Sequence, residues 1–178
     1  MALRYPTKLF HRITDITPEL LAEMNARALL LDVDNTLSRH GEQTPYPGAV
    51  EWVERMRKAG YRLVILSNNT HERVQPFAAQ FGLEFITFAM KPLPVGYLRA
   101  ARQLKIPTKQ CVIIGDQVYT DIIGANLCGM KSLLLDPIEE ETSRSFRLRR
   151  KWERSIRQKM AARQQADAKT QKCGKDES

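Results

Sequence analysis

Two aspartates separated by one residue, Asp32 and Asp34, follow directly after the apolar stretch 28–31. The stretch is expected to form a buried parallel strand. Because side chains alternate along a strand, both carboxylates project from the same side at its carboxyl end. Two anions this close require a shared proton or a bound cation. Since ligands of open α/β sheets lie at the carboxyl ends of the strands, the sequence predicts an active site at this position.

Three later apolar runs are each followed by residues that could bind a ligand. Parallel strands place their carboxyl ends at one edge of the sheet, so these residues can converge with the two aspartates. They supply a hydroxyl, an ammonium group and two further carboxylates. The residues expected at this edge are Asp32, Asp34, Ser67, Lys91, Asp116 and Asp121.

The elements that would position these residues alternate between helix and strand. A first helix is expected to begin at Thr17-Pro18, because threonine caps a helix and proline fits its first turn. This alternation predicts an α/β fold, a three-layer α/β/α sandwich around a parallel, Rossmann-like sheet. The expected strands cover 28–33, 63–66, 85–88, 111–114 and 132–135, and the later helices cover 47–59, 70–81, 95–104 and 121–128.

The four segments together resemble the four motifs of haloacid dehalogenase-like phosphatases. The motifs are Asp32-x-Asp34-x-Thr36, an apolar run into Ser67, Lys91, and Gly115-Asp116-x4-Asp121, in that order. The resemblance covers residues 28–135, and the combination is far more specific than any single motif. It implies a haloacid dehalogenase-like fold and a Mg²⁺-dependent phosphatase that hydrolyses a phosphomonoester through an aspartyl-phosphate.

Phosphoryl transfer requires a nucleophile, neutralisation of charge on the transferred group and a proton for the leaving oxygen. In the family's pattern Asp32 attacks phosphorus and Asp34 acts as general acid and then general base. Mg²⁺ prefers oxygen ligands, which the carboxylates and the main-chain carbonyl of Asp34 offer. The expected metal residues are Asp32, Asp34, Asp116 and Asp121, the last either a ligand or a support, and the expected phosphate-binding residues are Ser67, Asn68 and Lys91.

Each motif alone also has an ordinary structural explanation. Ser67-Asn68-Asn69 is more often a turn, and Lys91 would be a surface lysine. Gly115-Asp116 fits the strand-to-helix turn of many Rossmann-like folds. The occurrence of all four motifs in order favours the functional interpretation.

Three further polar residues have two possible roles each. Asn35 and Asn69 either line the pocket or make turns. His71 is the one histidine that the sequence places near the site, although a polar residue at a helix N-terminus is the commoner role.

The connections are too short for the cap domain that many relatives of this fold carry. About a dozen residues separate Asp34 from the next helix, and residues 70–90 are filled by one helix and a short strand. An uncapped site is open to solvent. It favours large or membrane-bound phosphorylated substrates, or a homo-oligomer in which a neighbouring subunit acts as the lid.

Among capless members, those of subfamily IIIA, the sequences Asp-x-Asp-Asn-Thr-Leu and Gly-Asp-Gln-x-x-Thr-Asp most resemble the bacterial YqeG-type family. Its relatives include mitochondrial phosphatidylglycerophosphate phosphatases, so the resemblance implies a lipid substrate such as phosphatidylglycerophosphate. Those lipid enzymes carry lysine between the two aspartates, where this chain has Val33. This difference leaves the expectation of a phosphatase intact and weakens the expectation of a lipid substrate.

The charge of the chain is concentrated at one end. Residues 1–143 contain 16 Lys and Arg and 16 Asp and Glu, and residues 144–178 contain 12 and 4. A neutral body with a basic tail indicates that the tail is the part that binds any acidic partner. Three cysteines without metal-ligand spacing favour reduced thiols. The apolar runs are far shorter than a membrane span, so a cytoplasmic protein is expected.

Residues 144–165 are expected to form a basic amphipathic helix with apolar residues four apart. Its apolar stripe docks on the domain, or residues 144–163 bind an anionic membrane surface or RNA. In the membrane case the protein is peripheral to the membrane. The alternative function is a phosphatase-like scaffold that binds RNA, a ribosomal particle or a membrane. The expected organisation is a phosphatase domain over 1–140, a helix over 141–165 and a disordered tail over 166–178.

Overall fold

The computed structural model describes residues 3–137 and 153–166. The chain divides into two compact units, Met1–Glu139 and Glu140–Ser178. In the second unit residues 153–166 are helical. The predicted domain boundaries stay predictions. The predicted helical residues 141–152 and the predicted disorder after residue 166 lie outside the described residues.

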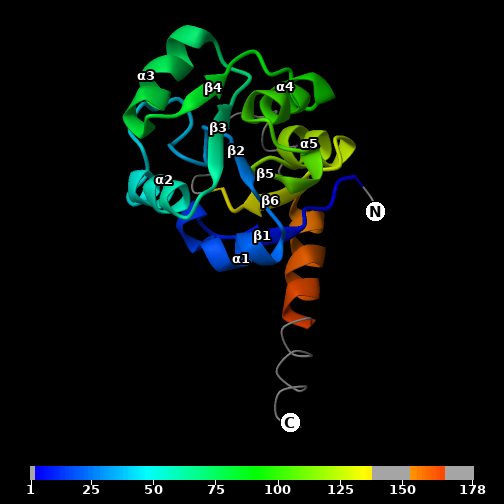
Figure 1. Cartoon of the computed structure of the whole chain (residues 1–178). Helices are drawn as coiled ribbons and strands as arrows, with labels where there is room; N and C mark the ends of the chain where they lie inside the picture. Colours follow the sequence, from blue (N-terminus) through cyan, green and yellow to red (C-terminus); the bar gives the residue numbers. More distant parts are fainter. Residues whose placement is uncertain (1–2, 138–152, 167–178) are drawn as a thin grey trace. The chain divides into compact units, whose positions relative to one another are not determined.

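The first unit is built around one sheet of six strands in the order β1-β6-β5-β2-β3-β4 (Figure 1). All neighbouring strands pair in parallel. The central strands are almost entirely apolar, as expected of strands that helices cover on both faces. The strands are β1 (Lys8–Phe10), β2 (Ala28–Leu31), β3 (Arg62–Leu66), β4 (Glu84–Ile86), β5 (Cys111–Gly115) and β6 (Lys131–Leu135).

The helices of this unit form one layer on each face of the sheet (Figure 1). One core contains residues of α1, α2 and α3, and the other contains residues of α4 and α5. Three short helices, η1 (Ile13–Asp15), η2 (Thr108–Gln110) and η3 (Val118–Ile122), connect the main elements. The α-helices are α1 (Pro18–Glu23), α2 (Ala49–Lys58), α3 (His71–Phe81), α4 (Pro94–Leu104) and α5 (Ile123–Leu127).

Strand β2 shows how the sheet separates the two cores. Leu29 and Leu31 belong to the core under α1, α2 and α3, and Ala28 and Leu30 belong to the core under α4 and α5. All four are fully buried. This alternation follows from the two-residue period of a strand. The predicted three-layer α/β/α sandwich is confirmed.

The order of the strands creates the position for a site. β2 lies between β3, the next strand in the chain, and β5, a later one. At such a topological switch point a crevice opens beyond the carboxyl ends of the strands. Leu31 is level with Ile65 of β3 and with Ile114 of β5, so the residues that follow all three reach the same edge.

Beyond shifts of one or two residues at element ends, such as β4 at Glu84–Ile86 where 85–88 is expected, two elements differ from the sequence expectation. Lys8–Phe10 form β1, an edge strand paired with β6, and three residues are too few for hydrophobic periodicity to reveal. The predicted helix 121–128 begins earlier, as the π-helix η3, and continues as α5. π-Helical turns frequently occur at functional sites, and this one contains Asp121.

Within residues 3–137 no additional domain interrupts the fold where a cap would be inserted. Residues 32–48 separate β2 from α2, and α3 with its flanking turns separates β3 from β4. None of the helices that the structure describes is long and apolar enough to span a bilayer.

Candidate active site

Asp32 lies directly after β2, at the carboxyl edge of the sheet. Its backbone N–H donates to the carbonyl of Ile114 at 3.0 Å, so β2 and β5 remain hydrogen-bonded up to this residue. Asp32 is 7% exposed. A carboxylate this enclosed requires a compensating positive charge or a proton.

Lys91 supplies this charge. Its Nζ donates to Asp32 Oδ1 at 2.6 Å and to Asp121 Oδ1 at 2.8 Å. Asn68 holds the main chain of Lys91, because the Lys91 N–H donates to Asn68 Oδ1 at 2.7 Å and Asn68 Nδ2 donates to the Lys91 carbonyl at 3.1 Å. Lys91 is therefore a buried residue of the site and not a surface lysine.

Asp32, Asp116 and Asp121 form a buried acidic cluster, in which one carboxylate oxygen of each lies within 4.8 Å of the others. Gly115 makes room for it, because a Cβ at this position would lie 2.3 Å from Asp121 Oδ2. Carboxylate oxygens at this spacing fit a hard divalent cation. The Asp34 carboxylate is not part of the cluster, so its predicted metal contact would be the main-chain carbonyl.

Burial raises the pKa of Asp32 from its ordinary value of 3.8 to about 7, an effect that Lys91 opposes and Asp121 reinforces. Burial also raises the pKa of Asp121, again against the Lys91 charge. For Lys91, burial alone would lower the pKa, but the Asp121 and Asp32 carboxylates outweigh it and raise the pKa. Lys91 is therefore held as an ammonium ion. Protons and a cation compete for the acidic cluster.

Asp34 occupies a different environment, although one residue separates it from Asp32. The predicted strand 28–33 is two residues too long: β2 ends at Leu31. The chain then turns tightly, so strand alternation does not govern Asp34. Its carboxylate accepts three hydrogen bonds, from Arg73 Nη2 at 2.6 Å, Asn69 Nδ2 at 2.9 Å and the Gly41 N–H at 3.0 Å.

The tight turn is visible in its backbone hydrogen bonds. The N–H groups of Thr36, Leu37 and Ser38 all donate to the carbonyl of Val33, at 2.9 to 3.2 Å. Asn35 adopts a left-handed conformation, with φ of 56°, which asparagine tolerates better than most residues. Asn35 is therefore part of this turn.

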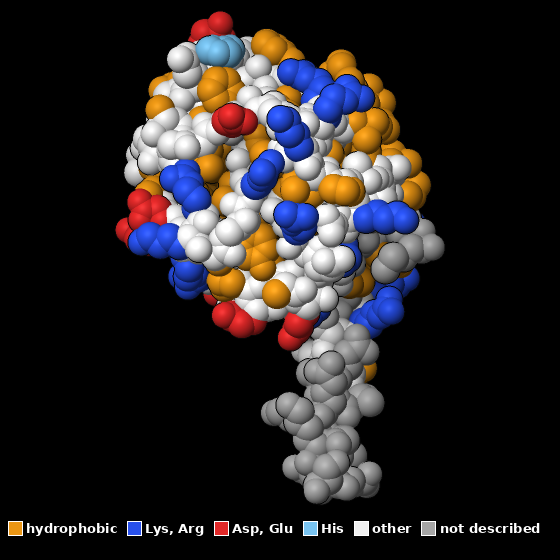
Figure 2. Space-filling model, in the orientation of Figure 1, with side chains coloured by type: hydrophobic (Ala, Val, Ile, Leu, Met, Phe, Trp, Pro, Cys, Tyr) orange, Lys and Arg blue, Asp and Glu red, His pale blue; other side chains and the backbone are white. Residues whose placement is uncertain are grey.

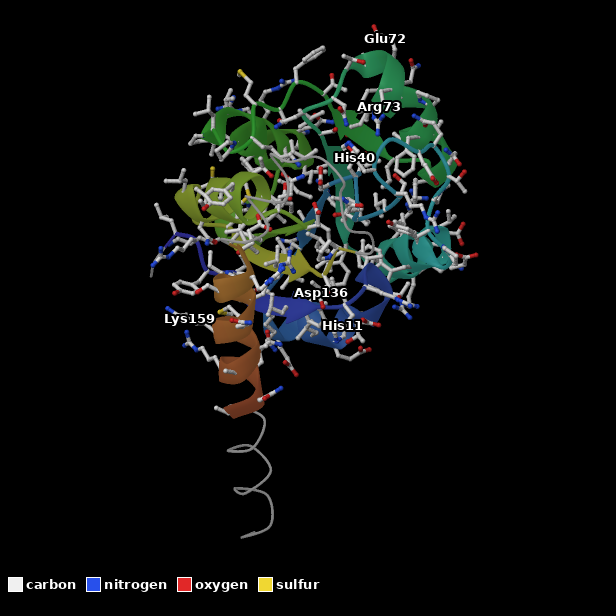
Figure 3. The ribbon with its side chains drawn as sticks, turned by 180° about the vertical axis from the view of Figure 1, so that it is seen from behind. His11, His40, Glu72, Arg73, Asp136 and Lys159 are labelled. Carbon is white, nitrogen blue, oxygen red and sulfur yellow. The ribbon has the colours of Figure 1, made fainter. Side chains whose placement is uncertain are left out.

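Two residues beside Asp34 have no motif in the sequence. Arg73 extends from α3 and His40 from the loop after β2, where His40 Nδ1 lies 3.6 Å from Asp34 Oδ1 (Figure 3). The one available signal for Arg73 is its position four residues after Asn69, which also contacts Asp34. His71, the histidine expected nearest the site, is the first residue of α3 and packs edge-on against Phe85, with ring centroids 5.2 Å apart.

Ser67 is fixed at the end of β3. Its N–H donates to the Ile86 carbonyl at 2.9 Å, its carbonyl accepts from the Ala89 N–H at 3.0 Å, and its Oγ accepts from the Asn69 N–H at 3.2 Å. The pairing of β2 with β3 brings Ser67 to the edge that holds Asp32. The predicted phosphate-binding roles of Ser67 and Asn68 stay predictions.

Large hydrophobic side chains are exposed around Lys91. Phe88, Met90 and Leu93 are 58%, 53% and 56% exposed. Figure 2 shows hydrophobic side chains gathered over the region of α4, with Lys and Arg side chains beside them. Exposed apolar patches of this kind commonly mark a surface that contacts a ligand or partner.

The matches to known proteins agree with this site. The family model of haloacid dehalogenase-like hydrolases matches residues 11–129. The chain belongs to this family and is a phosphatase. It is 36% identical to the probable phosphatase YqeG of Bacillus subtilis (strain 168), over 85% of this chain and 88% of that protein. The predicted family and enzyme class are confirmed.

Two solved structures have the same fold. The putative HAD-hydrolase YfnB from Bacillus subtilis, bound to magnesium, has a TM-score of 0.55 at 13% identity, over 67% of this chain and 91% of that one. The cobalt-bound deoxy-D-mannose-octulosonate 8-phosphate phosphatase from Haemophilus influenzae has a TM-score of 0.52 at 16% identity, over 61% and 68%. At these identities the likeness shows the fold alone.

Proposed function

We propose that the chain is a Mg²⁺-dependent phosphomonoesterase in which Asp32 is the nucleophile and Asp34 the general acid and base. One observation carries the proposal: Lys91 Nζ bridges Asp32 and Asp121 within a buried cluster of three carboxylates. Burying three acids and one lysine together costs free energy, and a structural role alone does not require it. A site that binds a cation and a phosphate does require these charges together.

The donor set of the cluster fits Mg²⁺. The residues that would hold the ion are Asp32, Asp116, Asp121 as ligand or support, and the main-chain carbonyl of Asp34, all of them oxygen donors. Bound there, Mg²⁺ neutralises charge on the phosphoryl group and keeps the phosphate close to the nucleophile.

The remaining residues account for the other requirements of phosphoryl transfer. An Asp32 oxygen attacks phosphorus and forms an aspartyl-phosphate while the alcohol leaves. Lys91 and Ser67, with Asn68 next to them, would stabilise the phosphate oxygens. Asp34 would protonate the leaving oxygen and then accept a proton from the water that hydrolyses the intermediate. Its exposed fraction, 14% for the side chain, leaves it within reach of both.

The substrate that we propose is a large or lipid-borne phosphomonoester, such as phosphatidylglycerophosphate. Its support is the open site with the exposed side chains of Phe88, Met90 and Leu93 beside Lys91. The unusual Val33 is buried in the core under α1, α2 and α3. In this chain the side chain between the two aspartates therefore packs inside the domain.

The test of the enzyme is hydrolysis of an aryl phosphate with Mg²⁺. Asp32→Asn should lower kcat by at least about 1000-fold, because an amide does not form the aspartyl-phosphate. The matched control is Asp15→Asn, in η1 outside the site, which should retain native activity. Undiminished activity of Asp32→Asn contradicts the proposal.

The substrate class needs its own assay. Phosphate release should be compared between phosphatidylglycerophosphate in mixed vesicles and a set of water-soluble phosphomonoesters. A higher kcat/KM for the lipid supports the lipid-borne class, and a preference for a small metabolite contradicts it.

The basic C-terminal segment supports a second candidate function, the binding of an anionic membrane surface or RNA. In the described helix 153–166, Arg154, Lys159 and Arg163 are exposed. Deletion of residues 144–178 should abolish binding to anionic vesicles or RNA and leave turnover of a soluble substrate unchanged. Equal binding with and without the segment contradicts this role. The predicted homo-oligomer stays a prediction, which the mass in solution would test.

A further inference from the structure

Arg73 makes one hydrogen bond to Asp34, whereas arginine–carboxylate pairs frequently make two. One nitrogen, Nη2, donates to Asp34 Oδ1 at 2.6 Å. The other oxygen of Asp34 is taken by Asn69. The guanidinium group has five N–H donors in a fork that matches two oxygens of one anion, so this single contact leaves much of its capacity for a second anion.

The Nε atom of Arg73 likewise has unused hydrogen-bonding capacity. It is enclosed by protein, and no acceptor lies within hydrogen-bond distance among the residues that the structure describes. An enclosed N–H without an acceptor is unfavourable. A rearrangement of the guanidinium group that satisfies Nε and Nη2 together would therefore be favourable once an acceptor is present.

Hydrogen bonds hold the main chain of Arg73 in place, while its guanidinium group remains able to rearrange. Gln43 Nε2 donates to the Arg73 carbonyl at 3.0 Å, and Gln80 Nε2 donates to the Gln43 carbonyl at 2.8 Å. These bonds fix the loop after β2 on α3. The Arg73 side chain is 31% exposed, so part of it is accessible from solvent.

Arg73 and His40 both place nitrogen atoms beside Asp34, which is the anion already at this position. His40 lies on the same side of Asp34, whereas Glu72, the neighbour of Arg73 on α3, points away from the pair (Figure 3). If Asp34 protonates the leaving oxygen, then the alcohol part of the substrate must lie beside Asp34, and so beside Arg73. The phosphoryl group that is transferred lies at Asp32 and Lys91 instead.

We propose that Arg73 and the adjacent His40 form a subsite for a second anionic group, carried by the alcohol part of the substrate. The group is a carboxylate or a phosphate ester, because both match the guanidinium fork. This subsite rests on the proposed function, since the position of the alcohol follows from the role of Asp34. It makes Arg73 a specificity-determining residue.

The test uses two matched pairs of substrates. Phosphoglycolate and ethyl phosphate differ by a carboxylate, and 1,3-propanediol bisphosphate and propyl phosphate differ by a second phosphate. The native protein should have a kcat/KM at least about tenfold higher for the anionic member of one pair. The pair that shows this preference identifies the recognised group as a carboxylate or a phosphate. Arg73→Gln should remove this preference: kcat/KM should fall at least about tenfold more for the anionic member of the pair than for the neutral member, which senses only the lost contact with Asp34.

Two variants separate recognition from folding. Arg73→Lys keeps the charge without the fork and should restore part of the preference. Arg102→Gln, exposed on α4, should behave as the native protein. The subsite is overturned if the native protein prefers the neutral members, or if Arg73→Gln lowers kcat/KM equally for both members of a pair. The second outcome is what a purely structural contact to Asp34 predicts.

A binding measurement keeps the subsite distinct from the proposed function. Binding of the same four compounds to Asp32→Asn requires no turnover. At least about tenfold tighter binding of an anionic member, lost in Asp32→Asn/Arg73→Gln, supports the subsite. Equal affinities for both members overturn it. Absence of aryl phosphate hydrolysis by the native protein with Mg²⁺, with this binding preference intact, contradicts the proposed function and leaves the subsite standing.

Discussion

Asp32 and Asp34 are the same residue type, one residue apart, and the structure gives them different partners. Asp32 is enclosed among charges, with Lys91 Nζ at 2.6 Å and two further carboxylates within 4.8 Å. Asp34 is partly open to solvent, and its three partners are hydrogen-bond donors from α3 and two loops. The two side chains are similarly exposed, 10% for Asp32 and 14% for Asp34, so the two carboxylates differ mainly in their partners.

The difference explains how one short motif can supply two chemical roles. An oxygen that attacks phosphorus must be fixed and protected from water, and the Asp32 cluster provides both. A group that exchanges protons with an alcohol and with water must reach them, and this is the role that we propose for Asp34. Pairs of carboxylates whose environments diverge in this way are a recurrent solution for acid and base chemistry.

Lys91→Met should have the largest effect on stability. It leaves Asp32 and Asp121 buried without their counter-charge, and the loss of one partner from a buried charge cluster costs about 3–5 kcal/mol of unfolding free energy. Urea denaturation in EDTA measures it, with Lys58→Met, exposed on α2, as the control that should stay within about 0.5 kcal/mol. Equal stability of Lys91→Met and the native protein would show that the cluster does not depend on this charge.

Asp34→Asn should lower the activity far more than the stability. We expect kcat to fall about 100- to 10000-fold, because proton transfer is lost, and the unfolding free energy to fall by only about 1 kcal/mol. Steady-state kinetics and urea denaturation measure the two effects, with Asp15→Asn as the control. A loss of stability as large as that of Lys91→Met would contradict the distinction between the two environments.

The smallest effect concerns pH in the metal-free protein. Burial raises the pKa of Asp32 from 3.8 to about 7, so between these values the folded state binds more protons than the unfolded state. Stability should therefore fall as pH rises from 4 to 7. Because Asp121 shifts in the same direction, Asp32→Asn should weaken this fall without abolishing it.

The measurement is the unfolding free energy in EDTA at pH 5 and pH 8, for the native protein and for Asp32→Asn. Asp15→Asn serves as the control and should reproduce the native pH dependence. An identical slope in Asp32→Asn and the native protein would mean that Asp32 is not the buried acid responsible.

Much of the site could be predicted because parallel strands bring their carboxyl ends together. The apolar runs before Asp32, Ser67 and Asp116 identify three adjacent strands of the sheet, and the order of the motifs identifies the family. Lys91 follows from the same reasoning, although its bridging contact does not. The acidic cluster and the three-layer fold were therefore available from residue types and spacing.

Other features depend on contacts that no local pattern encodes. β1 has three residues, and its place depends on β6, which comes more than a hundred residues later. The contact of Arg73 with Asp34 depends on how the first turn of α3 faces the loop after β2. The π-helix around Asp121 depends on the bonds that its own carboxylate makes, including one from the Gln117 N–H at 3.1 Å.

By itself, the sequence determined the family, the parallel sheet, and the presence of two aspartates at the end of a buried strand. Alternation along that strand predicted one common environment for them. The tertiary structure decided otherwise, because β2 ends at Leu31 and the following turn directs Asp34 towards α3. Burial and neighbouring charge fix the chemistry of a carboxylate, and both come from segments distant in the chain that spacing alone does not place.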